Sequence, residues 1–376
     1  MSEEDKNILK IKNIPPVTIG SYIDKILEFC IDNDVSDVHI LSDGKLKVDI
    51  QGRFYVIIDR TISYNEAIGY MSHIYEGKTV ETRLNSGNAI DKAHQIKYKG
   101  SKYRFRVNAV ACQVKGKAGL QITIRTISEF PPSKKDLNVE DEIWDNFMPE
   151  QGIVFVTGPT GSGKSTLLAA CIREILMTEN LNKKIVTLEA PIEYVYDAFE
   201  NDTSIITQTE VPTQIKSFKL GVEAALRRAP DIILVGESRD KETIDAAITA
   251  AQTGHLVYTT LHTNGVAASL RRLLSVYSPE ERDEKMAALL DSTHMIITQR
   301  LEKTLDGRRA PIKEYLVFDK DVKEKLYEAE SSKVSYEIIK ILREKKTRMI
   351  DSAEKIFKDG KISEEQLIKI KTSFKG

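Results

Sequence analysis

The stretch Ile153-Val-Phe-Val-Thr-Gly158-Pro-Thr-Gly-Ser-Gly-Lys164-Ser-Thr166 decides the fold of this chain. An apolar run of strand character leads into the pattern G-x-x-x-x-G-K-[ST], and an amphipathic helical segment from Leu167 to Met177 follows it. The glycines let backbone N–H groups turn inward around phosphates, and the helix N-terminus adds positive potential. The stretch therefore predicts a phosphate-binding loop for a nucleoside triphosphate.

The residues of this loop have distinct expected roles. The Lys164 ammonium should reach the β- and γ-phosphates, and the Ser165 hydroxyl should ligate Mg²⁺. The remaining phosphate-binding positions are predicted to be Pro159, Thr160, Gly161, Ser162, Gly163 and Thr166.

The bulk composition indicates a multidomain globular protein with an ion-rich surface. The chain has 376 residues, too many for one typical core, and 41% of them are apolar while 30% are charged. A net charge of −1 removes any whole-protein argument for attraction to nucleic acid or membranes. The three cysteines are far apart and form no C-x-x-C pattern, which favours a reducing compartment over a disulfide framework or a cysteine zinc site.

Two segments bear on cellular location. Residues 1–12 are charged throughout and do not resemble a signal peptide, so we expect a cytoplasmic protein. The longest stretch without Asp, Glu, Lys or Arg, residues 246–270, contains Thr, Gln, His and Asn. We interpret it as buried core, and we expect membrane association only through partners.

The first third of the chain mixes a helix with alternating strands. Residues 21–33 are predicted to be helical, and alternation predicts strands over 45–50, 54–58, 103–108 and 120–125. Gln51-Gly52 is typical of a hairpin turn. We therefore predict an α+β domain over residues 1–130, followed by a linker over 131–150 that begins with two prolines.

The second part of the chain alternates apolar strands with helices. Strands are predicted over 153–157, 185–188, 232–235 and 256–260, and this alternation favours an α/β fold with a parallel sheet covered by helices. We assign residues 151–290 to this core and 291–376 to a mainly helical C-terminal region. Ser363 and Gln366 form a capping pair for its last helix.

Two glutamates follow strands of the predicted sheet. Glu237 comes shortly after strand 232–235, where an acid lies beside the Mg²⁺ and the attacking water, so it is a candidate metal ligand and catalytic residue. Glu189 follows strand 185–188, at the edge where such sheets build their sites. A carboxylate there can accept a proton from water or orient it. A solvated surface glutamate is the alternative for each.

Two of the six histidines, His255 and His262, bracket strand 256–260. Their spacing is irregular and no third ligand is close in sequence, so they make a poor metal pair. They are candidates for sensing the γ-phosphate or for hydrogen bonding in the site. Histidines satisfied within the core are the alternative.

The order of these motifs resembles the secretion ATPase superfamily, the motors of type II and type IV secretion, type IV pili and conjugation. The resemblance spans about residues 36–318 and includes an N-terminal Ser-Asp-x-His pattern. Its later motifs are the phosphate loop, Leu188-Glu-Ala-Pro-Ile-Glu-Tyr194, Arg227-x-x-Pro-Asp-Ile-Ile-Leu-Val-Gly-Glu-x-Arg-Asp240, Thr253-Gly-His255, Thr260-Leu-His-Thr-Asn264 and Gln299-Arg-Leu301. It implies a RecA-like P-loop ATPase core, a smaller PAS-like N-terminal domain, and ATP as the nucleotide.

The resemblance also assigns roles. It places Glu189 in the acidic box, Glu237 at the Walker B position, and both histidines in the histidine box. Arginines of this family reach the phosphates across a domain or subunit gap, where a cation neutralises charge on the transferring phosphoryl group. The candidates here are Arg104, Arg106 and Arg125, and an ordinary exposed strand arginine is the alternative for each.

Two departures narrow the branch of the superfamily. No cysteine follows Cys171, so the tetracysteine insertion usual in type II members is missing, and Ala190 stands where most members have Asp. Both features favour the DotB/TraJ branch, the ATPases of Dot/Icm type IVB secretion and related conjugation systems. Pilus-retraction ATPases, with a similar length and domain plan, are the nearest alternative.

The predicted function is a cytoplasmic homo-hexameric ATPase that drives assembly of, or transport through, a type IV secretion system, in particular a type IVB system. By resemblance, its partners are inner-membrane secretion components and a second secretion ATPase or coupling protein. Direct nucleic-acid binding is not expected, because no basic stripe interleaved with aromatics stands out. The alternatives are a pilus retraction motor and a nucleotide-gated assembly scaffold with incidental hydrolysis.

Overall fold

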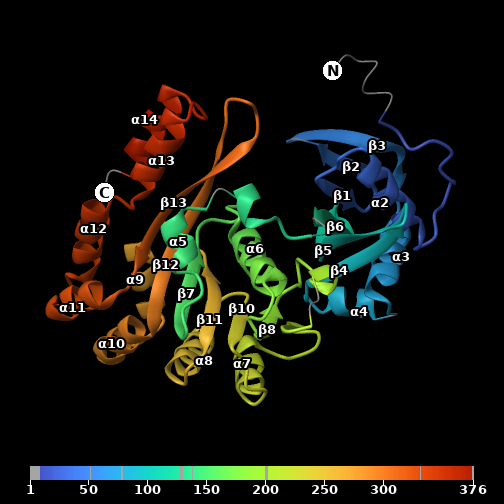
Figure 1. The fold of residues 1–376 in the computed structure, drawn as a ribbon. Coiled ribbons are helices and arrows are strands. Elements are labelled where there is room, and N and C mark those ends of the chain that lie inside the picture. The colour runs from blue at the N-terminus through green and yellow to red at the C-terminus, as the bar shows by residue number, and fades with distance from the viewer. Residues whose placement is uncertain are drawn as a thin grey trace. The chain divides into compact units, whose positions relative to one another are not determined.

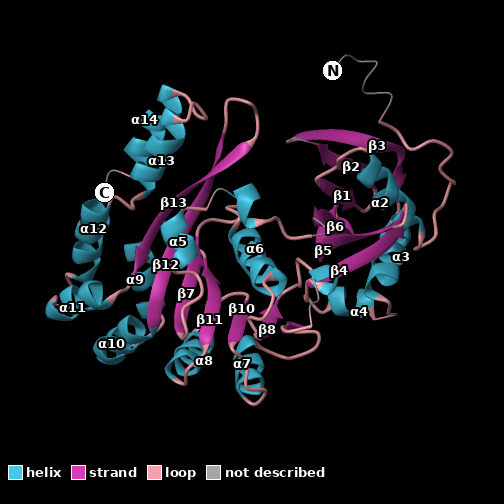
Figure 2. Ribbon diagram, viewed as in Figure 1, coloured by secondary structure: helices cyan, strands magenta, loops and turns pink. Residues whose placement is uncertain are grey.

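The chain folds into two compact units, Met1–Phe130 and Pro131–Gly376. The computed structural model describes residues 9–50, 52–77, 79–127, 130–137, 139–199, 202–330 and 332–374. Each unit is built around its own sheet, as Figures 1 and 2 show. None of the helices in these ranges is long and apolar enough to cross a lipid bilayer.

The N-terminal unit is an antiparallel sheet with helices packed on one face (Figure 2). Its strand order is β3-β2-β1-β6-β5-β4. The strands are β1 Asp37–Leu41, β2 Gly44–Ile50, β3 Arg53–Ile62, β4 Ile90–Tyr98, β5 Ser101–Val114 and β6 Lys117–Ile127, and the helices are α2 Tyr22–Asp32, α3 Tyr64–Tyr75 and α4 Val80–Asn85. Alternate strand residues such as Phe105 and Ile124 are buried against helix residues such as Ile26, which leaves polar side chains on the other face.

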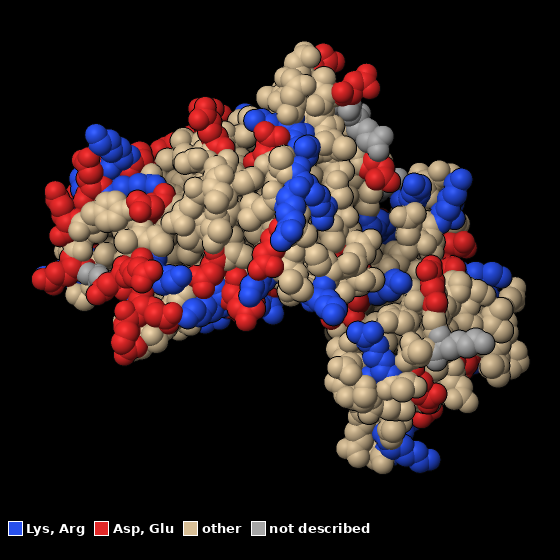
Figure 3. All heavy atoms as spheres, turned by 90° about the horizontal axis from the view of Figure 1, so that it is seen from below, with Lys and Arg blue, Asp and Glu red and all other residues tan. Residues whose placement is uncertain are grey.

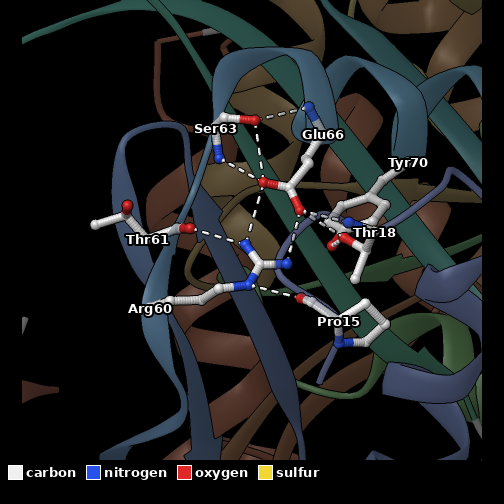
Figure 4. A network of polar contacts seen from close by, with 7 residues as sticks. All are labelled: Pro15, Thr18, Arg60, Thr61, Ser63, Glu66 and Tyr70. Atoms are coloured by element: carbon white, nitrogen blue, oxygen red, sulfur yellow. Dashed lines mark hydrogen bonds and ion pairs between the residues drawn. The ribbon is translucent and has the colours of Figure 1, made fainter. Parts of the chain in front are cut away.

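A buried carboxylate ties the start of α3 to β3 and to the segment before α2 (Figure 4). Glu66 accepts hydrogen bonds from the Arg60 guanidinium at 2.7 and 3.1 Å, from Thr18 N at 2.8 Å and Thr18 Oγ1 at 2.7 Å, and from Ser63 N at 3.0 Å. Ser63 completes a capping box with Glu66. Burial alone raises the Glu66 pKa, but the hydrogen bonds outweigh it and lower this pKa to about 2.

The second unit contains a seven-stranded sheet in the order β13-β12-β7-β11-β10-β8-β9. Its strands are β7 Gly152–Thr157, β8 Lys184–Glu189, β9 Ile205–Glu210, β10 Ile232–Val235, β11 Leu256–Leu261, β12 Thr293–Lys303 and β13 Arg309–Val317. Neighbouring strands are parallel except for the antiparallel pair β12–β13. The register pairs Thr157 with Leu261, so β7 and β11 end side by side.

Helices cover both faces of this sheet (Figure 1). One face packs α5 Asp141–Asp145 and α6 Lys164–Met177, and the other packs α7 Phe218–Leu226, α8 Lys241–Gln252, α9 Val266–Leu274, α10 Arg282–Ser292, α11 Lys320–Glu328 and α12 Val334–Lys345. Two further helices, α13 Met349–Lys358 and α14 Glu364–Ser373, form a small separate core with β13. The 3₁₀ turns are η1 Lys134–Leu137, η2 Asp197–Phe199 and η3 Pro279–Glu281. This architecture confirms the predicted α/β class.

All four strands predicted for the second sheet are present, but three more were missed. The region 291–376, predicted to be mainly helical, begins with β12 and β13, which extend the sheet beyond residue 290. Helix α10 ends at Ser292 and β12 begins at Thr293, so no glycine or proline marks the change. The missed strand β9 lies at the sheet edge and is only partly buried, which weakens its apolar pattern.

Three smaller predictions can be compared with the structure. The segment predicted as a linker, 131–150, contains η1 and α5, and buries Ile143 and Phe147 against the sheet. The capping box of Ser363 and Gln366 is confirmed at α14. Strands β2 and β3 pair on either side of the predicted hairpin turn, of which Gln51 lies outside the described residues.

Charge on the molecular surface is mixed. On the face shown in Figure 3, Lys and Arg side chains lie among Asp and Glu side chains rather than covering a broad area alone. This distribution agrees with the net charge of −1.

Candidate functional site

The phosphate loop joins the end of β7 to the start of α6 and relies on glycine at two crowded positions. Gly158 has a φ of 144°, and a Cβ there would lie 2.2 Å from Gln299 O. Gly163 has a φ of 84°, and a Cβ there would lie 2.8 Å from Gln299 Nε2. The Gln299 amide donates to Ser162 O at 2.7 Å. Strand β12 therefore braces the loop from the side, which explains why only glycine fits at both positions.

Two side chains of the loop fit an anionic ligand. Lys164 is buried, and its Nζ donates to Gly158 O at 2.9 Å and Pro159 O at 3.0 Å. Burial lowers the Lys164 pKa, although the Glu193 charge opposes this effect. The Ser162 hydroxyl is buried and has no hydrogen-bond partner among the described residues. A buried ammonium held by carbonyl oxygens and an unsatisfied hydroxyl are groups that phosphate oxygens can satisfy.

The rest of the loop faces outward. Pro159, Thr160 and Gly161 are exposed at its tip, and a Cβ built on Gly161 would meet nothing within 4 Å. Ser165 is exposed in the first turn of α6, while the Thr166 hydroxyl lies 3.3 Å from the Tyr194 hydroxyl. The open side of the loop is thus lined by the residues that the sequence assigns to phosphate binding.

Glu237 and His262 come together at the same edge of the sheet. They follow the ends of β10 and β11, and Glu237 Oε1 lies 3.3 Å from His262 Nε2. The Arg239 guanidinium contacts the same carboxylate oxygen. Burial, followed by the charges of Lys164 and Arg239, lowers the His262 pKa, so the imidazole is neutral at pH 7. Leu261 pairs with Thr157, and Gly158 N donates to Leu261 O at 3.2 Å, so His262 follows the strand end that lies beside the start of the phosphate loop.

Glu189 occupies the end of β8 and is held by neutral donors. Thr187 Oγ1 donates to Glu189 Oε1 at 2.6 Å, and Gln208 Nε2 donates to the same oxygen at 3.1 Å. The second amide hydrogen of Gln208 goes to Tyr194 O at 2.8 Å. Burial raises the Glu189 pKa, only partly opposed by these hydrogen bonds. A carboxylate with a raised pKa is better matched to accepting a proton from water.

Gln208 was not identified from the sequence, and Tyr194 was named only as the last residue of a motif, without a role. Together with Thr166 they connect the start of α6 to Glu189 through hydrogen bonds. Gln208 lies on β9, the edge strand that the alternation did not reveal. The parallel register of β9 with β8 places Gln208 opposite Thr187, two residues before Glu189. The only sequence signal for Gln208 was its position as a polar residue within the short β-branched run from Ile205 to Thr209.

His255 lies away from this group. It precedes β11, at the amino end of the strand, whereas His262 follows the carboxyl end. A six-residue strand is about 20 Å long. His255 Nδ1 is 3.0 Å from Ala250 O and 3.2 Å from Thr253 Oγ1, both in the turn that ends α8. The structure therefore does not bring His255 to the phosphate loop of its own chain.

The three predicted arginines share one face of the N-terminal sheet. Arg106 pairs directly with Arg125 across β5 and β6, and Arg104 lies two residues before Arg106. Arg125 Nε donates to Asp37 Oδ1 at 2.8 Å. This face is opposite the one that buries Phe105 and carries the helices. A role for these arginines at the phosphates stays a prediction.

Glu314, a glutamate that was not predicted from the sequence, holds the loop that carries His262. Glu314 on β13 accepts from Val266 N at 2.8 Å, at the start of α9, and from Met349 N at 3.5 Å, at the start of α13. Gly265 precedes α9 with a φ of 123°, and a Cβ there would lie 3.2 Å from Glu314 Oε1. Glu314 therefore positions the end of the segment from His262 to Gly265 against the C-terminal helices.

The residues predicted to hold Mg²⁺ have suitable chemistry. Mg²⁺ takes oxygen ligands, and Ser165 and Glu237 supply a hydroxyl and a carboxylate at the edge of the sheet that carries the phosphate loop. The donor set therefore fits this cation.

Comparison with known proteins identifies the family. The family of type II/IV secretion system proteins matches residues 16–333, most of the chain. The chain belongs to this family. Solved structures of this family include ATPases, and the chain is an ATPase with a nucleotide-binding loop of the geometry described above.

Three members of the family show the range of similarity. The X-ray structure of the Legionella pneumophila ATPase DotB is 40% identical, with a TM-score of 0.87, and the match covers 96% of this chain and 98% of DotB. The pilus retraction motor PilT with bound ADP is 28% identical, with a TM-score of 0.77, covering 92% and 96%. The uncharacterized protein YggR of Escherichia coli K12 is 30% identical over 295 residues, which are 78% of this chain and 86% of YggR.

Proposed function

We propose that this ATPase works as a homo-hexamer of a type IVB, Dot/Icm-like secretion system, where ATP hydrolysis drives assembly or transport. The observation that carries the proposal is the match to DotB, which extends over 98% of that protein at 40% identity. The solved structure of PilT matches over a similar length at lower identity and TM-score. Ala190 and the absence of any cysteine after Cys171 favour the same branch.

The site residues divide the chemistry between them. Lys164 and the loop amides would hold the phosphates of ATP, and Ser165 and Glu237 would hold Mg²⁺, which supplies charge neutralisation at the phosphates. Glu237 is already engaged by Arg239 and His262, which suits a metal ligand with a fixed position. Glu189, with its raised pKa, is the proposed proton acceptor for the attacking water.

The N-terminal arginines complete this proposal. Arg104, Arg106 and Arg125 carry positive charge on one face of their sheet, and such a face can deliver a cation to a neighbouring nucleotide. In a hexameric ring, hydrolysis of each nucleotide would then move the subunits that contact it. Inner-membrane components and a second secretion ATPase or coupling protein are the partners expected of such a ring.

Turnover by the purified protein tests the enzymatic part. Lys164→Ala should abolish Mg²⁺-dependent ATP hydrolysis, and His262→Ala should lower it on the order of tenfold, which is about 1.4 kcal/mol. His255→Ala should leave it within about twofold, because His255 lies at the other end of β11. Unchanged hydrolysis in the Lys164 variant would overturn the assignment of the site.

Deleting the gene in its native cell tests whether the protein serves a secretion system. The proposal predicts loss of type IV protein secretion and restoration by the wild-type gene but not by Glu189→Gln. Loss of pilus retraction with intact secretion would instead support the second candidate, a retraction motor, which the similarity to PilT favours. Restoration of secretion by Glu189→Gln would favour the scaffold alternative.

A further inference from the structure

Two histidines converge on one carboxylate in the N-terminal unit. Asp24 lies in the first turn of α2, His73 in the last turn of α3, and His94 on β4. His73 Nε2 is 2.8 Å from Asp24 Oδ2, and His94 Nε2 is 2.8 Å from Asp24 Oδ1. One ligand atom from each residue lies within 4.8 Å of the others. Elsewhere in the described ranges no second group of His, Cys, Asp and Glu meets this criterion.

The position of His94 needs an explanation that the ATPase function does not supply. His94 pairs with the buried Phe105 across β4 and β5, so it lies on the helix-covered face of an edge strand. Its side chain is only 10% exposed, whereas those of Asp24 and His73 are 31% and 35% exposed. The cluster is therefore anchored in the core and open to solvent on one side, as an entry path for an ion requires.

We propose that Asp24, His73 and His94 form a binding site for a divalent transition cation of the Zn²⁺ type. Two imidazoles and one carboxylate, with water in the fourth position, are a known ligand set for zinc. Ligands about 2.0–2.2 Å from a tetrahedral ion lie about 3.3 Å from one another. Each imidazole nitrogen lies 2.8 Å from a different oxygen of Asp24, so a bound ion would take one of these oxygens after small rotations of the side chains open the nitrogen–oxygen separations.

The surrounding structure holds the three elements in place for this purpose. At the far end of α2, Asp32 accepts from Tyr98 at 2.7 Å and Lys99 at 2.6 Å, so α2 is fixed to β4 independently of Asp24. Before α2, a Cβ on Gly20 would lie 2.4 Å from Gly69 O, so the chain packs directly on α3. The cation would fasten α2, α3 and β4 together at the remaining point and stabilise the unit.

Metal titration of the intact protein tests the site. The protein is stripped with chelator, exchanged into buffer without nucleotide, and titrated with Zn²⁺ in a calorimeter and with Co²⁺ in a spectrophotometer. We expect one ion per chain and the visible bands of four-coordinate Co²⁺. Asp24→Asn and His94→Gln should each weaken binding at least tenfold. The matched control His39→Gln, in the same unit but outside the cluster, should bind as the wild type does.

A second measurement on the wild type keeps the test independent of how the variants fold. Zn²⁺ should slow chemical labelling of His73 and His94 by diethylpyrocarbonate, with no change at His39. His262→Gln should leave Zn²⁺ binding intact, because that histidine belongs to the nucleotide site. Absence of stoichiometric binding, equal binding by Asp24→Asn, or loss of binding only in His262→Gln would each overturn the proposal. The ATPase assignment does not depend on any of these outcomes.

Discussion

Two carboxylates, the buried Glu66 in the N-terminal unit and the half-buried Glu189 in the second unit, differ in the kind of partner that holds them. Glu66 in the N-terminal unit pairs with the Arg60 guanidinium, and its pKa falls to about 2. Glu189 at the edge of the ATPase sheet is held by the neutral donors of Thr187 and Gln208, and its pKa is raised by burial. A charged partner fixes a permanent anion for structure, whereas neutral partners leave a carboxylate that can exchange a proton.

The largest expected effect is on turnover, at Glu189. Glu189→Gln keeps the shape of the side chain but removes its ability to accept a proton, so kcat should fall about 10²- to 10⁴-fold. Nucleotide affinity should change little, since the substitution leaves the phosphate loop intact. Steady-state hydrolysis and equilibrium nucleotide binding measure the two quantities. Glu223→Gln, an exposed change on α7, is the control. A Glu189→Gln variant that retains half of the wild-type turnover would contradict the role of Glu189 as proton acceptor.

The next effect is on stability, at Glu66. Glu66→Ala leaves the Arg60 guanidinium and the Thr18 and Ser63 donors without their shared acceptor, so the N-terminal unit should lose about 3 kcal/mol. Hydrogen exchange of peptides covering β3 and α3 measures this loss within the unit. Lys117→Ala, at the exposed start of β6, should leave the exchange of these peptides almost unchanged. ATP binding to the other unit should also be retained.

The pH dependence of the same carboxylate gives a third effect. The Glu66 pKa is about 2 in the fold against an ordinary value of 4.5, so its contribution is fully present above pH 4.5 and is lost as the pH falls toward 2. The stability advantage of the wild type over Glu66→Gln, at most about 3 kcal/mol, should therefore shrink through this window. Hydrogen exchange at several acidic pH values measures it. A constant difference from pH 6 to pH 3 would contradict the assignment.

The smallest effect sharpens the contrast at Glu189. Gln208→Leu removes one of the two side-chain donors to Glu189, so the Glu189 pKa should rise further. The acidic limb of the pH–rate profile should move to higher pH, with only a several-fold loss of kcat at its optimum. A profile that keeps its position while kcat falls would show that Gln208 acts only through packing. Gln252→Leu, at the exposed end of α8, is the control.

Much of the fold was predictable because the second unit is locally consistent. The strands that begin at Ile153, Ile185, Ile232 and Leu256 are short apolar runs bounded by turns, and a buried parallel strand needs little else. Strands β12 and β13 were missed because α10 passes directly into β12. The loop residues and the two glutamates at strand ends could be placed, since parallel strands end at a common edge.

The sequence by itself determined the phosphate loop, the order of motifs around it and the family to which the chain belongs. Those features are local: a strand, a glycine turn and a helix specify the loop without distant contacts. Only the tertiary structure decided which histidine joins Glu237, that Gln208 and Glu314 support the site, and that Asp24, His73 and His94 meet. These outcomes depend on strand order, register and helix packing, which bring together side chains as many as 70 residues apart in the chain.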